Sequence, residues 1–227
     1  MELKKALSEK YDDIKMDTRA RLAPIRRKKI ADISFSIISN NCWGGIVYQR
    51  YGLPYTSPTA GLYFFADDYI KLLGNLKYYM SIPMTTISVD ESSHKETILK
   101  RHHEVFPIGR IDDVEVVFRH YPTAEEAIEK WERRKKRINY NNLIVKFSEM
   151  NLCTEEHVNQ FLDMPYDTKF AFVTSPTKVR DKRLVCYHGY ETLDRIPDDT
   201  KHYCKYIDIN ALINRHEIVP HGTPMWS

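Results

Sequence analysis

The sequence lacks the short motifs of three large enzyme classes. It contains no phosphate-binding Gly-x-x-x-x-Gly-Lys-Ser/Thr, no Gly-x-Gly-x-x-Gly and no His-Glu-x-x-His. Nucleotide hydrolysis, dinucleotide redox chemistry and zincin proteolysis each depend on such a motif, so none of them is expected. No apolar run approaches the ~20 residues that span a bilayer. The first thirty residues are charged throughout, unlike a secretory signal, so a cytoplasmic protein is expected.

Cysteine is scarce, and no Cys-x-x-Cys pair occurs in the 227 residues. The four cysteines are Cys42, Cys153, Cys186 and Cys204. In a chain without a secretory signal they are expected to be free thiols. Cys186-x-His188 and His202-x-Cys204 form a weak candidate zinc site, because residues two apart on a strand share a face. The alternative is that these are core cysteines at two strand ends.

Neither sign of charge dominates the chain, which carries 34 basic and 31 acidic residues. Residues 1–30 hold ten basic and five acidic residues, which leaves 24 and 26 for residues 31–227. A near-neutral body makes nucleic acid a poor partner. Residues 1–30 are expected to be a basic helical segment, limited by Pro24. This segment either contacts an acidic membrane surface or a capsule-assembly partner, or is a solvated helix.

Strands and helices are predicted to alternate through residues 31–227, which are interpreted as one α/β domain. Strands are expected over 33–38, 105–110, 114–118, 143–147, 170–173 and 184–187. Helices are expected over 44–51, 69–80, 124–138, 154–162 and 207–213, with residues 85–112 less regular. This alternation predicts a layered sheet that is largely parallel with some antiparallel pairing. The 15 tyrosines suit a polar pocket for sugar.

The strongest local feature is the strand, turn and helix at 33–51. Cys42 lies at the carboxyl end of the strand and before a helix N-terminus, a position that lowers a thiol pKa. Gly44 and Gly45 would let a ligand approach the backbone. This pattern indicates either a nucleophile or an anion cradle. The alternative is a small buried cysteine beside glycines that permit close packing.

Several runs of residues resemble one family. They are Ser39-Asn40-Asn41-Cys42-Trp43-Gly44-Gly45, Tyr48-Gln49, Gly52-Leu53-Pro54-Tyr55, Ser57-Pro58-Thr59, Gly61-Leu62-Tyr63, Asp68-Tyr69-Ile70, Asn75-Leu76, Tyr78-Tyr79-Met80, Phe106-Pro107-Ile108-Gly109, His120-Tyr121-Pro122, Asn139–Phe147 and Phe170–Val173. The chain is identified over 28–215 as similar to the domain-of-unknown-function 1919 family, usually labelled exopolysaccharide biosynthesis proteins. The resemblance implies a three-layer α/β/α fold and a place among bacterial capsule and exopolysaccharide genes.

A shorter resemblance bears on the reaction. Asn41-Cys42-Trp43-Gly44 is similar to the Asn-Cys-Gln-Gly that follows the first strand in some CoA-binding capsule biosynthesis enzymes, with Trp43 in place of Gln. Those proteins are regarded as acetyltransferases with an esterase-like sheet. The resemblance implies that Cys42 or its turn lies at an acyl-transfer centre, with acetyl-CoA as donor.

Acyl transfer needs a base near the nucleophile and an acid that orients the base. His120 is chosen as base because it lies between a strand end and a helix, and Glu149 as acid because it follows a strand. Alternatives are the histidines His94, His102 and His103 and the carboxylates of Asp67 and Asp68, which also suit helix caps. The expected binding residues are Asn40, Asn41, Trp43, Gly44, Gly45, Ser57, Asp68 and Lys146.

The leading hypothesis is a transferase of bacterial surface-polysaccharide biosynthesis that moves acetyl from acetyl-CoA to a sugar hydroxyl. One alternative is another transferase with a nucleotide-sugar or phosphate donor. Another is a non-catalytic protein that binds carbohydrate or assists capsule assembly, with Cys42 merely packed.

Overall fold

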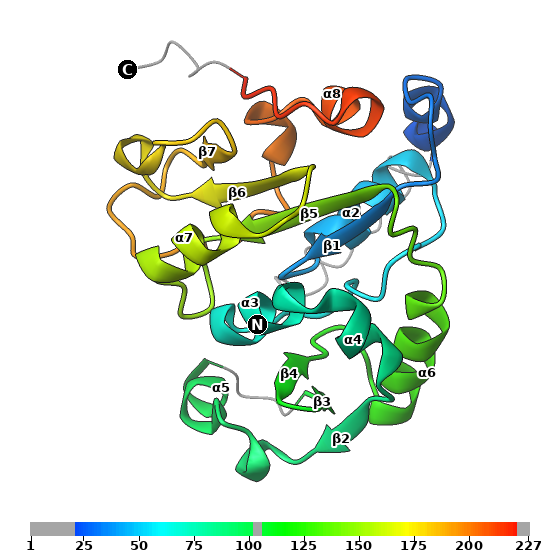
Figure 1. Ribbon diagram of the computed structural model, residues 1–227, viewed down its shortest axis with the longest axis vertical. Coiled ribbons are helices and arrows are strands. Elements are labelled where there is room, and N and C mark those ends of the chain that lie inside the picture. Colours follow the sequence, from blue (N-terminus) through cyan, green and yellow to red (C-terminus); the bar gives the residue numbers. More distant parts are fainter. Residues whose placement is uncertain (1–20, 102–105, 222–227) are drawn as a thin grey trace, which may run out of the picture.

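The computed structural model describes residues 21–101 and 106–221. Four parallel strands form the central sheet in the order β1-β5-β6-β7 (Figure 1). They are β1 (Ser36–Ser39), β5 (Leu143–Ser148), β6 (Lys169–Val173) and β7 (Leu184–Cys186). All but the first residue of β5 and the last residue of β7 are buried. Burial on both faces explains why these strands are nearly continuous apolar runs.

Helices cover both faces of this sheet. The helices on one face are α2 (Trp43–Tyr51) and α8 (Ile209–Arg215), and those on the other are α3 (Ala66–Gly74), α4 (Leu76–Ser81) and α7 (Glu155–Asp163). Successive strand residues point to opposite faces, so Ile37 packs toward α2 and Ile38 packs toward α3. The α/β class is therefore confirmed, with one helical layer on each side.

The antiparallel strands form a separate sheet. Its strands are β2 (Thr85–Ile87), β3 (Ile108–Ile111) and β4 (Val114–Val117) in the order β2-β3-β4. Figure 1 shows this small sheet below the parallel one, with α3 and α4 between them. Asp112 turns the β3–β4 hairpin with a φ of 54°, as the Asp-Asp pair predicts. β2 and the helix α5 (Lys95–Arg101) lie in the stretch predicted to be irregular.

Two helix predictions need correction. The single helix expected over 69–80 is two helices, α3 and α4, because Asn75 leaves the helical region with a φ of −148°. Pro24 was expected to end the N-terminal helix, yet residues 21–27 are helical through it. Proline already has a helical φ and removes only its own N–H. Residues 1–20 lie outside the described part of the chain.

The predicted helix at 124–138 is α6 (Ala124–Lys135). The Thr123 side chain accepts a hydrogen bond from the Glu126 N–H at 3.2 Å, which satisfies one free donor at its start. Within the described residues, no helix is both long enough and apolar enough to cross a bilayer.

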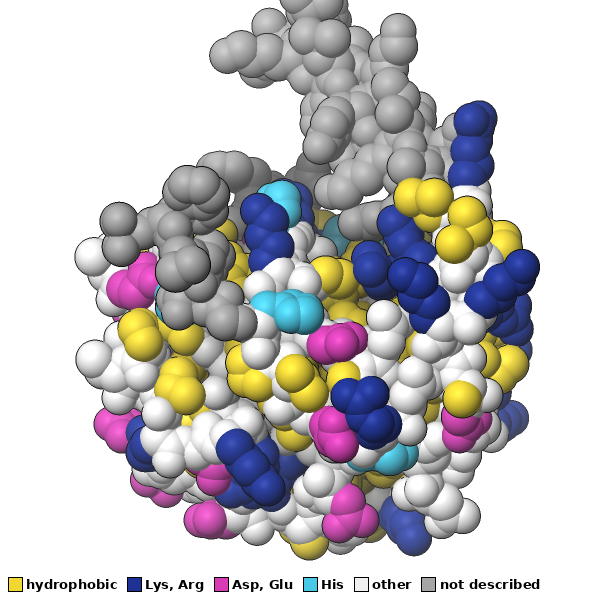
Figure 2. Space-filling view, turned by 90° about the horizontal axis from the view of Figure 1, so that it is seen from above, with side chains coloured by type: hydrophobic (Ala, Val, Ile, Leu, Met, Phe, Trp, Pro, Cys, Tyr) yellow, Lys and Arg dark blue, Asp and Glu magenta, His cyan; other side chains and the backbone are white. Residues whose placement is uncertain are grey.

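The basic character of the N-terminal segment is visible on the surface. Figure 2 shows Lys and Arg side chains gathered at the right, the side on which Figure 1 draws the helical residues 21–27. The basic residues of this stretch are Arg21, Arg26, Arg27, Lys28 and Lys29.

Candidate functional site

A cluster of buried polar side chains lies where β1 and β5 end, and we call Asn41, Lys146, Ser148 and Asp199 the buried polar cluster. Lys146 Nζ and Ser148 Oγ both bond to Asp199 Oδ2, and Lys146 Nζ also lies 3.2 Å from Asn41 Oδ1. Asn41 Nδ2 donates to Asp199 Oδ1 at 2.6 Å. The cluster thus ties the carboxyl ends of two strands to the loop that carries Asp199.

Lys146 was expected to bind substrate, but the structure places it out of reach of solvent. Its side chain and that of Asp199 are both fully buried. Burial lowers the pKa of Lys146, and the negative charge of Asp199 opposes this shift. Lys146 therefore forms a buried ion pair with Asp199 inside the buried polar cluster.

Two N–H groups at the start of α2 are already bonded to neighbouring side chains. The Trp43 N–H donates to Asn41 Oδ1 at 3.1 Å, and the Gly44 N–H donates to Ser39 Oγ at 3.2 Å. A Cβ on Gly44 would lie 3.0 Å from Ile37 Cγ2, so this glycine allows the helix to pack closely on the sheet. Gly45 similarly faces Ala60. The predicted anion cradle is wrong at these N–H groups, because neighbouring side chains occupy them.

Trp43 and Asn40 are also buried beside the cluster. The Trp43 ring packs edge-on against Phe170 at 5.5 Å, and Lys146 Nζ lies 5.8 Å from the Trp43 ring. Asn40 Nδ2 donates to the Ser148 carbonyl at 3.1 Å. Both side chains therefore stabilise the carboxyl edge of the sheet by packing and hydrogen bonding. No described residue hydrogen-bonds Asn40 Oδ1.

The lowered pKa expected for Cys42 is also wrong. Its thiol donates to the Leu62 carbonyl at 3.4 Å. Burial, and secondarily the charge of Asp199, raise the pKa of Cys42 to about 11. The nearby charge of Arg119 opposes this shift without reversing it. Desolvation outweighs the helix dipole here, so Cys42 is a protonated thiol at neutral pH.

We therefore expect Cys42 to alkylate slowly. A pKa raised from 9.0 to about 11 lowers the thiolate fraction at neutral pH about 100-fold. Iodoacetamide labelling followed by peptide mapping should show that Cys42 in the native protein reacts about 100-fold more slowly than a free model thiol. After denaturation, Cys42 should react at the rate of the free thiol. Rapid native labelling at Cys42 would contradict this result.

His120 and Glu149 are not joined to Cys42 in a hydrogen-bonded triad. The His120 N–H donates to the Gly61 carbonyl at 3.1 Å, next to the Leu62 that binds Cys42. Partial burial and the charge of Arg119 lower the pKa of His120, so its ring is neutral at pH 7. Glu149 lies at the end of β5 instead, where it accepts from the Thr174 N–H at 2.7 Å and pairs with Lys178.

Arg101 and Arg119 both lie near Tyr63, and Arg195 lies near Arg101, and we call these three arginines the arginine cluster. Arg101 and Arg119 both lower the pKa of Tyr63, which burial raises to about 12. Burial, and then the neighbouring Arg195, lower the pKa of Arg101. Arginines near one another raise the local positive potential, which favours an anion there.

Segment 63–68 connects the arginine cluster to a histidine–carboxylate pair. The Arg101 guanidinium lies 5.8 Å from the Phe65 ring centre, and the His94 ring stacks on the same ring at 3.8 Å. His94 Nε2 bonds to Asp68 Oδ2 at 2.6 Å, and Asp68 Oδ1 accepts from the Glu115 N–H at 3.0 Å. Asp68, expected to bind substrate or cap α3, therefore orients a histidine.

The His94–Asp68 pair lines a polar pocket of about 590 Å³. The described residues around it are Asp67, Asp68, Lys71, Ser93, His94, Arg110, Asp112, Asp113, Glu115 and Leu152. The His94 side chain is 12% exposed and that of Asp68 is 4% exposed. No described residue hydrogen-bonds His94 Nδ1, so this nitrogen has a lone pair to offer when Nε2 holds the proton shared with Asp68.

The neighbouring Asp67 forms a second pair with a different function. Its Oδ1 bonds to His157 Nε2 at 2.5 Å, and His157 Nδ1 accepts from the Thr154 N–H at 3.0 Å. His157 thus caps α7 and ties it to α3. The sequence offers His94 as an alternative base, whereas no motif in it singles out His157.

The remaining predicted residues lie elsewhere. Ser57 is buried in a turn, with its hydroxyl 2.9 Å from that of Thr59. His102 and His103 lie outside the described residues. His202 and Cys204 belong to a short 3-10 helix (His202 is its N-cap and Tyr203–Lys205 are its residues), so the predicted pairing of two strands is wrong.

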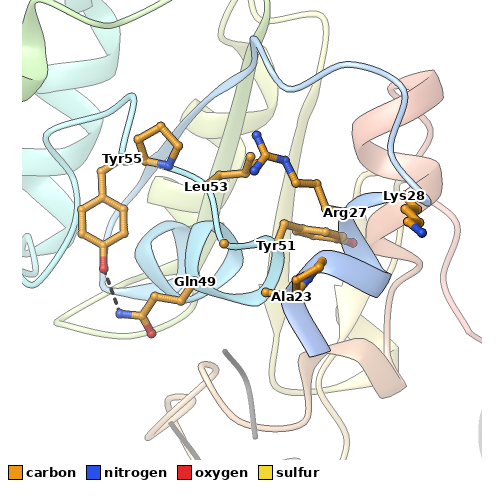
Figure 3. Close-up of a pocket in the computed structure, with 10 residues that line it drawn as sticks. Ala23, Arg27, Lys28, Gln49, Tyr51, Leu53 and Tyr55 are labelled. Carbon is orange, nitrogen blue, oxygen red and sulfur yellow. Dashed lines mark hydrogen bonds between the residues drawn. The ribbon is translucent and has the colours of Figure 1, made fainter. Parts of the chain in front are cut away.

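A larger and more apolar pocket of about 730 Å³ lies at the opposite edge of the sheet, near the C-terminus of α2. In Figure 3, Tyr55 and Gln49, joined by a 2.8 Å hydrogen bond, form one side, and Arg27 and Tyr51 form another. No carboxylate, imidazole or thiol is among the described residues that line it. It therefore offers no histidine–carboxylate pair like that of His94 and Asp68 in the polar pocket.

Two comparisons place the chain among known proteins. The family model described as Domain of unknown function (DUF1919) matches residues 14–217. A protein of Haemophilus influenzae named "Uncharacterized protein" is 27% identical over 172 residues, which cover 76% of this chain and 77% of that protein. The family match includes all the residues of the arginine cluster and the polar pocket.

Proposed function

The chain belongs to the DUF1919 family, and on that premise we propose that it is a transferase of bacterial surface-polysaccharide biosynthesis whose donor carries a diphosphate. One observation carries the proposal: the Phe65 ring contacts both His94 and Arg101. A histidine held by a buried carboxylate is thereby adjacent to a group of arginines. This arrangement pairs a general base with an anion-binding site.

The arginine cluster would bind the diphosphate of the donor. Arginine binds phosphate oxygens with paired N–H groups and stays charged throughout the physiological range. Acetyl-CoA and a nucleotide-sugar both carry a diphosphate, so the cluster suits either. Acetyl-CoA is the donor that the resemblance of the Cys42 turn favours, and it is the first to test.

The polar pocket would hold the acceptor sugar. Carboxylates accept hydrogen bonds from sugar hydroxyls, and the pocket contains those of Asp112 and Asp113. One acceptor hydroxyl would then lie against His94 Nδ1. The sugar would be held between the carboxylates and the donor, and this orientation would select the hydroxyl that reacts.

In acetyl transfer, the hydroxyl oxygen attacks the thioester carbonyl carbon while His94 Nδ1 takes the hydroxyl proton. Asp68 holds the imidazole in orientation and stabilises the imidazolium. The carbon–sulfur bond then breaks, and the imidazolium returns the proton to the CoA thiolate. This route is direct, since the protonated Cys42 is a poor nucleophile.

Donor binding tests the proposal. Arg101→Ala and Arg119→Ala should each weaken acetyl-CoA binding about 10- to 100-fold in calorimetry, since a hydrogen bond to a charged group contributes about 1.5–3 kcal/mol. Arg133→Ala is the matched control, because Arg133 lies on α6 in a surface pair with Glu129 at 3.3 Å.

The outcomes separate the two donors. Saturable acetyl-CoA binding with release of free CoA thiol in the presence of sugars selects acetyl transfer. Binding of UDP-glucose or another nucleotide-sugar, without acetyl-CoA binding, selects sugar transfer at the same cluster. If neither donor binds at millimolar concentration, or if Arg133→Ala weakens binding as much as Arg101→Ala, the proposal fails.

A further inference from the structure

A separate group of ligand atoms lies at the end of β7. Cys186 ends the strand, and His188 and Glu191 follow in the next turn. His188 Nδ1 lies 3.5 Å from Cys186 Sγ and 3.2 Å from Glu191 Oε1. All three atoms lie within 4.8 Å of one another. A thiol, an imidazole and a carboxylate, each a good zinc ligand, therefore lie close together.

The two separations that involve His188 Nδ1 suit a metal centre. Zinc bonds to sulfur at about 2.3 Å and to nitrogen or oxygen at about 2.1 Å. Tetrahedral angles then place sulfur and nitrogen about 3.5 Å apart, and nitrogen and oxygen about 3.4 Å apart. Among the described residues, these are the three His, Cys, Asp or Glu side chains that lie close enough together to share a metal ion. We propose that Cys186, His188 and Glu191 bind one Zn²⁺ ion.

The surrounding residues hold two of the ligands in position. The Gly189 N–H donates to Glu191 Oε2 at 2.9 Å, which directs Oε1 toward His188. Gly189 has a φ of 96°, and this turn brings Glu191 back over the strand end. The Tyr206 hydroxyl donates to the His188 carbonyl at 3.2 Å. Such outer contacts reduce the loss of side-chain freedom on binding a metal.

Three protein ligands leave the fourth tetrahedral position open. The side chains of His188 and Glu191 are 29% and 40% exposed, so water or a ligand can reach the metal. Closed structural zinc sites have four protein ligands, whereas sites that bind water or substrate keep three. As zinc binds, the Cys186 thiol gives its proton to solvent and the Zn–S bond forms, with no change of oxidation state.

This site differs from the four-residue zinc pattern of the sequence. Cys186 and His188 remain, Glu191 replaces His202 as third ligand, and Cys204 has no part. Zinc binding here is independent of the donor site, because it involves none of the arginine cluster.

Metal titration of the full chain tests the inference. Zn²⁺ added to the chelator-treated protein should bind with one equivalent at micromolar affinity or tighter. Co²⁺ in its place should give the sulfur-to-cobalt charge-transfer absorption of a thiolate ligand. Cys186→Ser should abolish that absorption and, like Glu191→Gln, weaken zinc binding at least about tenfold. Glu191 is at the surface, so its variant keeps the fold.

Cys204→Ser and His202→Asn are the matched controls, and both should bind zinc as the wild type does. Absence of zinc binding at 100-fold molar excess would overturn the inference. Unchanged zinc affinity in both Cys186→Ser and Glu191→Gln would also overturn it, and so would loss of the cobalt absorption in Cys204→Ser alone.

Discussion

Replacing Asp199 by Ala is expected to lower the free energy of unfolding by about 3–5 kcal/mol, because it leaves a charged lysine buried without its counter-ion. In the folded protein, Asp199 accepts from Lys146, Ser148 and Asn41. All three partners lose an acceptor in the variant, and Lys146 and Ser148 are fully buried. Urea unfolding followed by fluorescence measures the change.

The matched control is the adjacent Asp198. Its carboxylate accepts from the Thr200 N–H at 2.9 Å and pairs with Lys201 at 3.1 Å, but its side chain is 37% exposed. Asp198→Ala should therefore cost about 1 kcal/mol or less. A loss for Asp199→Ala no greater than that for Asp198→Ala would contradict the buried ion pair.

The double variant Lys146→Met/Asp199→Leu should recover part of the loss, since removing both charges removes the desolvation cost. The single variant also has a distinctive pH dependence. Burial already lowers the pKa of Lys146 from 10.5, and loss of Asp199 lowers it further. The unfolded state then binds more protons below pH 10.5, so the stability of Asp199→Ala should rise with pH from 7 toward 10 relative to the wild type.

The sequence predicted the parallel strands well because each is a short apolar run followed by polar residues. It also predicted that Asn41 lies at the edge of the sheet. It could not predict Asp199, which lies 53 residues beyond Lys146 in a Pro-Asp-Asp stretch typical of an ordinary turn. A buried ion pair of this kind depends on tertiary packing and leaves no periodic pattern.

Cys42 shows a different limit of prediction. The local geometry of a helix N-terminus favours a thiolate, and that expectation is sound for an exposed turn. Segment 61–62 covers the thiol in the folded protein, and the charge of Asp199 comes from a distant loop. Burial therefore decides the pKa, and only the tertiary structure reveals it.

Asp67 and Asp68 illustrate how position on a helix separates neighbours. Sequence patterns interpret both as caps of the same helix, yet the N-cap of α3 is Phe65. Consecutive residues lie about 100° apart around a helix, so the two side chains point to different neighbours. Asp67 turns toward His157 of α7, and Asp68 turns toward His94 in the polar pocket.

This difference leads to the largest expected effect on activity. His94→Gln should lower kcat for donor-dependent transfer by about 100- to 10,000-fold, which is the range for loss of a general base. Glutamine keeps a hydrogen-bond donor for Asp68 but cannot take a proton. The rate of CoA release from acetyl-CoA, or of nucleotide release from a nucleotide-sugar, measures the effect with whichever donor binds.

Asp68→Asn should reduce kcat in the same direction while donor affinity stays within about threefold of the wild type, because Asp68 acts on the base and not on the diphosphate. His157→Gln is the matched control: it removes the other histidine–aspartate pair, which ties α7 to α3. This variant should lower the free energy of unfolding but leave kcat nearly unchanged. The reason is that the Asp67–His157 pair takes no part in the Phe65 contact between His94 and Arg101. Full turnover in His94→Gln combined with loss of turnover in Cys42→Ala would reverse the assignment, and would return the chemistry to the thiol despite its raised pKa.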